Sequence, residues 1–510
     1  MSARGTAVRW LTLISGAALW LGCGGGGSSQ PAGGSASTAV LTADDVRAIV
    51  ERAARSLDVT TMAIAVTDRS GSVLGIFRKP DAPTTSIGNF SRPVDTNNLA
   101  VSLARTGAFF SNNQAPLSSR TVRFISGIHF PPGIPNTPNA ALYGIEGTNR
   151  GCNMQVDFLP GQAVPPSTSL DGSTGLGIIT GKANLSDSVS TAVSPGGVPI
   201  FKDGQVVGGV GVAGVDAALA EFAAFQGSLA GPAFGPHPAS PGVIFIDGVA
   251  LPFVQQATQP AGTHQGGSDG TWIVDPTAGG TVPDGWLAGP TGSAELSADQ
   301  VRTIVEQGIN TANNTRAAIR LPIGSTARMV LAVGDLDGNI LGLYRMSDST
   351  VFSIDVAVAK ARNVVYFSGP TRGVDELPGV PIGTAVTNRT INFGSQPLYP
   401  PGIDQQAPPE EGPFFSLYQF DVNHPCTQGQ QPPNPNQDGI VFFAGSVPLY
   451  RNGQLIGGLG ISGDGVEQDD VVAAGGARGF EAPAALRADQ VFVRGVRLPY
   501  LKFNRNPEVP

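Results

Sequence analysis

The residues in this chain that most resemble a known binding motif belong to two glycine-rich patterns. A GxGxxG pattern spans 209–214, and a second one spans 458–463. In a dinucleotide-binding fold such glycines end a strand and open a helix within a βαβ unit. Here each pattern lies in the second arm of a segment typical of a hairpin, and no parallel strand with a ribose-binding acid follows. We therefore interpret both patterns as places where a strand and a helix pack closely.

A short acidic run follows the second glycine pattern. Glu467, Asp469 and Asp470 lie close together in the sequence, as the ligands of a metal ion or a general base would. An acidic first turn that complements the dipole of a helix explains the same residues. We favour the helix turn, because the corresponding segment of the first half of the chain carries only Asp216 and Glu221.

Composition and missing motifs exclude several functions. The 510 residues carry a formal net charge of −8 and no dense Lys/Arg tract, whereas a nucleic-acid binder needs a basic stripe to neutralise phosphates. The sequence contains no HExxH, no CxxC pair and no GxSxG elbow. We therefore predict no metal site and assign no catalytic residue.

Residues 1–23 resemble a bacterial lipoprotein signal. Two arginines precede an apolar run over 10–21, which is too short to span a bilayer but suits a secretory signal. Cys23 follows that run, and the Gly/Ser-rich stretch 24–40 is typical of a flexible tether. We expect Cys23 to be lipidated, although Trp20 stands where such signals usually carry Leu. An ordinary signal peptide with an incidental cysteine is the alternative.

The expected location is therefore the cell envelope, with the lipid in the outer membrane or at the cell surface. Once Cys23 is set aside, Cys152 and Cys426 remain. An even number of cysteines in an oxidising compartment permits a disulfide. Two free or buried thiols are the alternative.

The sequence resembles itself in five blocks that occur twice in the same order. We infer two diverged copies of one domain: copy one at 41–260 and copy two at 296–510, joined by a Gly-, Pro- and Thr-rich linker at 261–295. The paired blocks are 41–53 with 296–308, 62–78 with 329–345, 118–134 with 387–403, 199–214 with 448–463, and 244–253 with 491–500.

Each block predicts one element of structure. The first has a Thr or Ser N-cap before apolar residues at helical spacing, and the second reads as a hairpin with a glycine-containing turn. A second helix is clearest at 353–367. The fourth block carries Asp203-Gly204 in copy one and Asn452-Gly453 in copy two, which are strong two-residue hairpin turns. Helices grouped around antiparallel hairpins predict an α+β layered domain.

Copy two resembles the GlcG/HbpS-like haem-binding protein family. The resemblance is carried by LSADQVRTIVEQG, AVGDLDGNILGLYRM, SIDVAVAKARNVVYFSGPTR and PLYRNGQLIGGLGISGDGVEQDDVVAAGG. It implies two tandem profilin-like domains, each an antiparallel sheet flanked by helices. Because such proteins usually assemble through dimers, it also implies that the two copies pack as an intramolecular pseudo-dimer. Long Pro-rich insertions in both copies depart from the family pattern.

The resemblance also implies a ligand-binding role for Lys360 and Arg362. Both lie on the second helix of copy two, which borders a ligand cleft in family terms, so that a cation there would pair with a propionate or another carboxylate. A solvated helix face is the alternative. The repeats contain only His129 and His424, both within the insertions, so a bound haem would need another axial group.

Three functions follow from these observations. The first is an exported lipoprotein that binds a small anionic ligand, such as haem or another tetrapyrrole. The second is a structural or interaction scaffold that has kept the domain and lost the ligand site. The third is a redox or haem-degrading enzyme built from scattered residues.

Overall fold

The computed structural model describes most of the chain beyond the N-terminal segment. The described residues are 39–130, 139–152, 154, 157–159, 162–163, 175–186, 195–235, 242, 244–246, 249–400 and 410–502. The predicted lipoprotein signal with Cys23, and nearly all of the tether, lie outside them. Ala39–Pro510 form one compact unit. Among the described residues, no helix has the length and apolar character needed to cross a membrane.

The first half of the compact unit contains a five-stranded antiparallel sheet with the order β11-β2-β1-β8-β7. Its central strands β1 and β8 are buried along almost their whole length, because both of their faces are covered. On β1, Ile64 and Val66 face one core, while Ala63 and Ala65 face another. The strands are β1 (Ala63–Asp68), β2 (Val73–Arg78), β7 (Gly197–Lys202), β8 (Gln205–Ala213) and β11 (Thr271–Val274).

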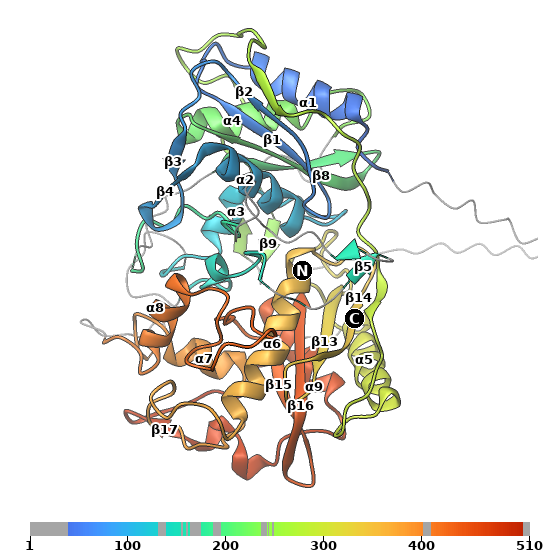
Figure 1. Cartoon of the computed structure of the whole chain (residues 1–510), viewed down its shortest axis with the longest axis vertical. Helices are drawn as coiled ribbons and strands as arrows, with labels where there is room; N and C mark the ends of the chain where they lie inside the picture. Colours follow the sequence, from blue (N-terminus) through green and yellow to red (C-terminus); the bar gives the residue numbers. More distant parts are fainter. Residues whose placement is uncertain are drawn as a thin grey trace, which may run out of the picture. The chain divides into compact units, whose positions relative to one another are not determined.

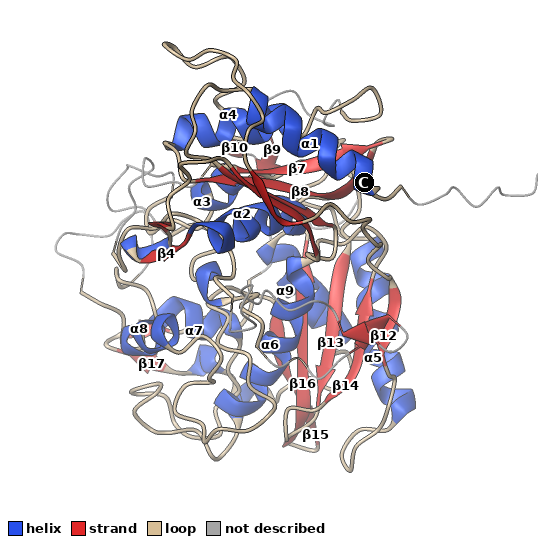
Figure 2. Cartoon of the chain, turned by 45° about the horizontal axis from the view of Figure 1, so that its top comes forward, coloured by secondary structure: helices blue, strands red, loops and turns tan. Residues whose placement is uncertain are grey.

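Three helices cover this sheet. α1 (Ala43–Arg55) and α4 (Ala217–Gly227) pack on one face, and α2 (Thr96–Phe110) packs on the other (Figure 2). The predicted cap of α1 is present, since the Thr42 side chain accepts a hydrogen bond from the backbone N–H of Asp45.

The second half repeats this layout with the strand order β12-β14-β13-β16-β15 (Figure 1). α5 (Ala298–Asn313) and α9 (Val466–Gly476) share one core with the sheet, and α6 (Phe352–Ser368) covers its other face. The predicted α+β class, with antiparallel sheets flanked by helices, is confirmed. The strands are β12 (Gly285–Ala288), β13 (Met329–Gly334), β14 (Ile340–Arg345), β15 (Ser446–Arg451) and β16 (Gln454–Gly463).

Shorter elements occupy the excursions between these layers. In the first half they are β3 (Thr85–Ile87), β4 (Pro93–Asp95), α3 (Ser119–Phe124), β5 (Asp157–Leu159), β6 (Gln162–Ala163), β9 (Ile244–Ile246) and β10 (Val249–Leu251). In the second half they are α7 (Asn388–Gly394), α8 (Phe415–Asn423), β17 (Phe492–Val493) and β18 (Val496–Arg497). Short 3-10 turns lie at Asn89–Ser91, Ile145–Gly147, Ala484–Leu486 and Ala488–Gln490.

The first two glycines of each GxGxxG pattern lie where a helix touches the sheet. A Cβ atom on Gly211 would lie 1.9 Å from the carbonyl oxygen of Ala100 on α2. The equivalent Gly460 would meet the carbonyl oxygen of Ala357 on α6 at 2.0 Å. Any side chain would force strand and helix apart, so the predicted packing role of these glycines is confirmed.

The predicted linker does more than connect the two halves. It supplies β11 to the first sheet and β12 to the second, which the sequence analysis did not anticipate. Each strand brings a tryptophan to the sheet edge: Trp272 packs edge-on against Phe77 at 5.3 Å, and Trp286 against Tyr344 at 5.4 Å between ring centroids.

The two halves share a core at the end of α2 and the start of α6. The rings of Phe110 and Phe352 stack with centroids 4.1 Å apart. Close by, the backbone N–H of Val351 donates to the carbonyl oxygen of Phe109 at 3.0 Å. One hydrophobic cluster contains these residues together with apolar side chains of α6 and of the second sheet.

Candidate functional site

The helix that carries Lys360 and Arg362 is buried along its whole length. All residues of α6 are buried, because the sheet covers one side and the excursion that contains α7 and α8 covers the other. The alternative of a solvated helix face is therefore wrong for both cations. The sequence could not show this, since the covering segment lies far along the chain.

Lys360 forms a buried ion pair inside the protein. Its Nζ lies 3.0 Å from Oδ2 of Asp469 and donates to the carbonyl oxygen of Ile461 at 2.6 Å, and it sits 4.8 Å from the ring centroid of Phe443. Burial lowers the pKa of Lys360 and raises the pKa of Asp469 to about 7, while the opposite charge of each partner acts against these shifts. The Lys360 charge is thus neutralised by a protein carboxylate.

Arg362 has a partner of the same kind and a second role. One of its terminal nitrogens lies 3.2 Å from Oδ1 of Asp438, and its Nε donates to the carbonyl oxygen of Gly338 at 3.0 Å. In the first half, Nε of Arg105 makes the same bond to Gly71 at 2.7 Å. Both arginines therefore fasten the hairpin turn of their sheet to the helix. Sequence reasoning missed this role, although the paired arginines and turn glycines were visible.

The acidic run begins α9, as the helix-turn interpretation expected, and each acid also has a cationic partner. Asp470 pairs with Arg389. Glu467 lies 2.5 Å from Nζ of Lys502, and Asp469 pairs with Lys360. Within the described part of the chain, no three His, Cys, Asp or Glu side chains are gathered so that they could hold a metal ion.

A cavity of about 460 Å³ lies between the β13–β14 turn, α6 and the segment 428–436. Leu336, Val365 and Leu455 are apolar residues of its lining, and several amide side chains also line it. Its volume falls in the range of small-molecule sites. The full lining is Leu336, Asp337, Gly338, Arg362, Val365, Tyr366, Gly369, Pro370, Thr371, Gln428, Gln431, Asn436, Gln454 and Leu455.

One buried polar atom of this cavity lacks a partner in the protein. The Asn436 side chain is only 7% exposed. Its Nδ2 donates to the carbonyl oxygen of Asp337 at 2.9 Å and to Oδ1 of Asn339 at 3.0 Å, whereas its own Oδ1 accepts nothing. Leaving a buried acceptor unsatisfied costs about 1–3 kcal/mol. A ligand that donates an N–H or O–H to this oxygen would recover that cost.

The charges of the cavity do not favour an anion. Among the described residues that line it, the only cation is Arg362, which already pairs with Asp438, and Asp337 adds a carboxylate. A ligand carboxylate would have to compete with Asp438. The structure therefore brings one of the two predicted cations to the cavity wall and leaves Lys360 away from it.

The residues around the cavity do not fit a haem held through its iron. No His, Cys or Met is among the described residues that line it, and neither His129 nor His424 belongs to the lining. The one phenol, Tyr366, donates to Oε2 of Glu376 at 2.6 Å. Burial raises the pKa of Tyr366, which disfavours the phenolate that binds iron. The lining fits a molecule that is held by hydrogen bonds at its edges and by apolar contact with its faces.

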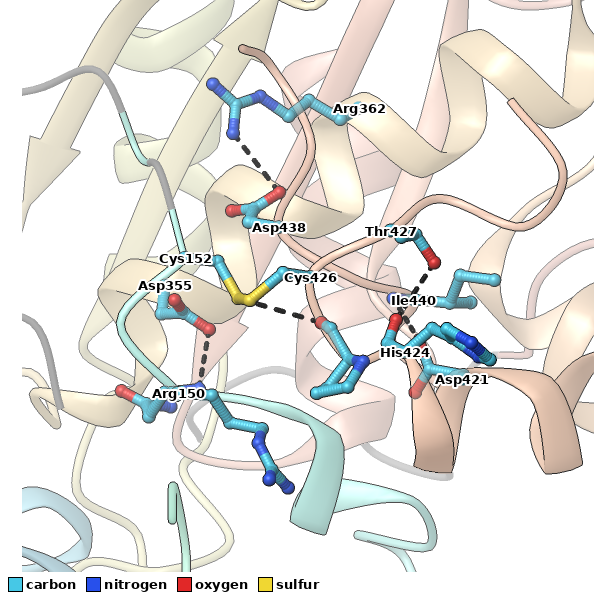
Figure 3. Close-up of a disulfide and its surroundings, with 12 residues drawn as sticks. Arg150, Cys152, Asp355, Arg362, Asp421, His424, Cys426, Thr427, Asp438 and Ile440 are labelled. Carbon is cyan, nitrogen blue, oxygen red and sulfur yellow. Dashed lines mark hydrogen bonds and ion pairs between the residues drawn. A yellow bond between two sulfur atoms is a disulfide. The ribbon is translucent and has the colours of Figure 1, made fainter. Parts of the chain in front are cut away.

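Cys152 and Cys426 form a disulfide with a Cα–Cα distance of 5.4 Å (Figure 3). The bond joins the excursion of the first half to that of the second, across 274 positions of sequence. Figure 3 draws it with the buried acids Asp355 and Asp438. Burial raises the pKa of Asp355 to about 7, with a further contribution from the charge of Asp438.

Two more acids at this junction, Asp438 and Asp421, have raised pKa values. Burial raises the pKa of Asp438 to about 6, against the opposing effect of Arg362. Burial also raises the pKa of Asp421 well above its ordinary value, although its carboxylate accepts a hydrogen bond from the backbone N–H of Ile440. The junction between the halves therefore contains several carboxyl groups whose proton affinity is increased by folding.

Comparisons with known proteins found similarity to part of the chain. Residues 296–478 match the model of the family described as "Haem degrading protein HbpS-like". A curated relative, an uncharacterised 15.0 kDa protein in the dhaT-dhaS intergenic region of Citrobacter freundii, is 28% identical over 145 residues, which are 28% of this chain and 70% of the relative.

Three solved structures are similar to part of the chain. A PduOC–haem complex is 22% identical, covers 37% of this chain and 98% of its own, and has a TM-score of 0.24. Klebsiella pneumoniae protein ORFY is 19% identical, with coverages of 38% and 95% and a TM-score of 0.23. A double mutant of Streptomyces reticuli HbpS is 18% identical, with coverages of 39% and 97% and a TM-score of 0.22. The similarity to the HbpS-like family therefore covers residues 296–478, which is about a third of the chain.

Proposed function

We propose that the second half of the chain is a binding module that holds a tetrapyrrole in the cavity beside α6. Every residue of the cavity wall lies within the segment 296–478 that matches the HbpS-like family. The observation that carries the proposal is the unsatisfied Oδ1 of the buried Asn436, which is poised to accept a hydrogen bond from a ligand. A protonated propionic acid at the edge of a porphyrin, or the lactam N–H of a linear tetrapyrrole, is a donor of the required kind.

In this proposal, apolar contact and hydrogen bonds hold the ligand. Leu336, Val365 and Leu455 offer an apolar wall, and Gln428 and Gln431 offer amide groups beside Asn436. Because Asp438 neutralises Arg362, we assign that arginine the role of shaping the cavity through the Gly338 turn. Lys360 belongs to the packing of α6 and α9.

A cavity-blocking variant tests the site. Thr371 is exposed and lines the cavity, so Thr371→Trp should fill its mouth. Val374 is exposed on the same loop and outside the lining, so Val374→Trp is the matched control. We expect Thr371→Trp to weaken protoporphyrin binding by at least about tenfold and Val374→Trp to leave it unchanged. Equal affinities of both variants and the wild type would refute this location.

The chemistry of Asn436 gives a second test of the same site. Asn436→Leu keeps the approximate volume and removes the acceptor. We expect about a tenfold loss of affinity, because one hydrogen bond to a neutral group is worth about 1 kcal/mol and the Leu leaves the ligand donor unsatisfied. Unchanged affinity, in a variant whose melting curve matches the wild type, would rule out this hydrogen bond.

We infer that the protein is exported and lipid-anchored at Cys23. The support is the signal-like pattern of residues 1–23 and the Cys152–Cys426 disulfide, since such bonds persist in oxidising compartments. Growth of bacteria that express the full chain with labelled palmitate tests the inference. Label on the wild type and its loss in Cys23→Ala is the expected result, and an unlabelled wild type would contradict it.

We also propose that the two halves form a pseudo-dimer within one chain. The shared core around Phe110 and Phe352 supports this arrangement. If one half occupies the surface that a second chain would otherwise use, the soluble part of the protein should be a monomer by light scattering at micromolar concentration. A stable dimer of whole chains would contradict the proposal.

A further inference from the structure

The first half of the molecule contains a cavity of its own, with a different chemistry. It has a volume of about 560 Å³ and lies between the start of α2, the end of β8 and the first turns of α4. Leu99, Leu103 and Leu219 contribute to its wall, and Ile87, which is 62% exposed, stands at its mouth. Among the described residues that line it there is no Lys, Arg or His.

The second half fills the equivalent place with buried polar side chains. The helix–sheet contact fixes the equivalence, because Gly211 meets Ala100 in one half as Gly460 meets Ala357 in the other. Along these helices and strands, four buried polar residues of the second half correspond to four apolar residues that all line the first-half cavity. The pairs are Lys360 with Leu103, Asp464 with Val215, Gln468 with Leu219, and Asp469 with Ala220.

At this place the first half differs from the second in its empty volume as well as in its polarity. In the second half, a Cβ atom on Gly445 would lie 2.7 Å from Nζ of Lys360 and 2.5 Å from Cβ of Asp469, so the ion pair packs directly against this glycine. In the first half the equivalent Gly196 lines the open cavity. Replacing the Lys–Asp pair by Leu103 and Ala220 therefore removes both charges and leaves space.

The apolar part of this open cavity is in contact with water, so covering it with an apolar molecule is favourable. Lys360 and Asp469 are replaced together, so that neither charge of this ion pair is left without its partner in the first half. The sole ionisable residue among the described lining is Asp216, which is exposed. An anion finds no cation here, and a buried charge of either sign finds no neutralising group.

We propose that this cavity is a binding site for an uncharged, predominantly apolar small molecule. The site shares no lining residue with the cavity beside α6. The chain then carries two sites of different selectivity, one in each half. This second proposal is independent of the tetrapyrrole proposal.

Two dyes with the same aromatic skeleton test the ligand class. N-phenyl-naphthylamine is uncharged, and anilinonaphthalene sulfonate is its anionic counterpart. Titrated into the full chain, the uncharged dye should bind saturably at about one molecule per chain, and the anionic dye at least about tenfold more weakly. Absence of saturable binding of the uncharged dye, or equal binding of both dyes, would overturn the proposal.

Variants on α4 test the location. Ala220 lines the cavity, and Ala218 is exposed on the same helix outside the lining. Ala220→Leu should weaken binding of the uncharged dye at least about tenfold, while Ala218→Leu should not change it. Should Ala220→Leu fail to fold in a melting experiment, Leu219→Gln, which introduces the residue of the second half, serves in its place. Equal effects at the lining and control positions would overturn the location.

The other cavity provides the last control. Thr371→Trp blocks only the cavity beside α6, so it should leave binding of the uncharged dye intact. Loss of dye binding in that variant would place the dye in the second half and overturn the proposal, whatever happens to the tetrapyrrole. Conversely, failure of protoporphyrin to bind leaves the dye result standing.

Discussion

At the scale of single residues, the fold buries several charged side chains that cannot be distinguished from surface residues in the sequence. Asp355 is the clearest case, since it begins α6 and its Oδ2 accepts a hydrogen bond from the backbone N–H of Asn149 in the other half at 2.9 Å. Burial raises its pKa from an ordinary 3.8 to about 7. The folded state therefore binds a proton that the unfolded chain has already lost at intermediate pH.

This linkage predicts how stability depends on pH. Protonation of Asp355 stabilises the folded state fully below about pH 4, and this stabilisation is lost as the pH rises through about 7. Above that pH the folded state holds a buried charge. Asp355→Asn mimics the protonated acid, so it should raise stability by about 1–3 kcal/mol at about pH 8 and change it little at about pH 4. Urea unfolding at both values measures this.

The exposed acid Asp81 is the control for this experiment, and Asp81→Asn should have no such pH-dependent effect. If Asp355→Asn were equally destabilising at both pH values, the carboxyl would be needed for its hydrogen bonds in either form. The predicted role of its protonation would then be wrong.

The Lys360–Asp469 pair predicts strong coupling between two residues. Lys360→Leu alone leaves Asp469 buried without its cation and should cost about 3–5 kcal/mol. Adding Asp469→Ala recreates the Leu and Ala of the first half and should recover a large part of that loss. A double-mutant cycle by urea unfolding measures the coupling. Simple addition of the two single effects would contradict it.

The candidate site was only partly predictable at this scale. The family pattern singled out Lys360 and Arg362, but the burial of α6 depends on the excursion around α8, which no local pattern can place. Asn436 gave no signal at all, because it lies in a Pro- and Asn-rich stretch that resembles an ordinary loop.

At the scale of elements, the sequence predicted the helices and hairpins whose formation depends on residues close together in the chain. The capped α1, the central hairpins and α6 follow from periodicity and capping, and the two hairpin turns have the positive φ values that Asp203-Gly204 and Asn452-Gly453 require. β11 and β12 escaped prediction because they are four-residue strands in Gly- and Pro-rich surroundings. Only their pairing with distant strands stabilises them.

The edge strand β12 is expected to contribute to the free energy of unfolding through its tryptophan. Trp286 on β12 packs against Tyr344 and lies over Gly342, where an added Cβ would be 3.1 Å from its ring. Trp286→Ala should lower the free energy of unfolding by about 1–3 kcal/mol, somewhat less than for a fully buried ring. Ile273→Ala on β11, at a side chain 47% exposed, should cost less than about 0.5 kcal/mol. Similar losses in denaturant unfolding would contradict a specific role for Trp286.

At the scale of the whole molecule, the two halves are joined by a shared apolar core and by a covalent bond. The disulfide closes a loop of 274 positions, so a chain-entropy argument predicts a large restriction of the unfolded state. The repeats in the sequence indicated two similar halves. Their tandem arrangement also led us to expect that the halves pack together, but no pattern in the sequence showed that α2 and α6 meet in the shared core.

Removing the disulfide should therefore weaken the whole unit. Replacing Cys152 and Cys426 together by Ser should lower the free energy of unfolding by about 2–5 kcal/mol. Thiol titration of the unreduced, unfolded wild type should find both cysteines blocked. Two reactive thiols in that sample would contradict the bond itself.

We propose above that the second half holds a tetrapyrrole without a bond to iron. Side-by-side titration of the full chain with hemin and with iron-free protoporphyrin tests it most directly. We predict saturable binding of both at about one per chain, with affinities within about threefold, because the cavity lining offers no His, Cys or Met. Hemin binding that is tighter by a hundredfold or more, with the spectrum of an axially ligated iron, would contradict the claim.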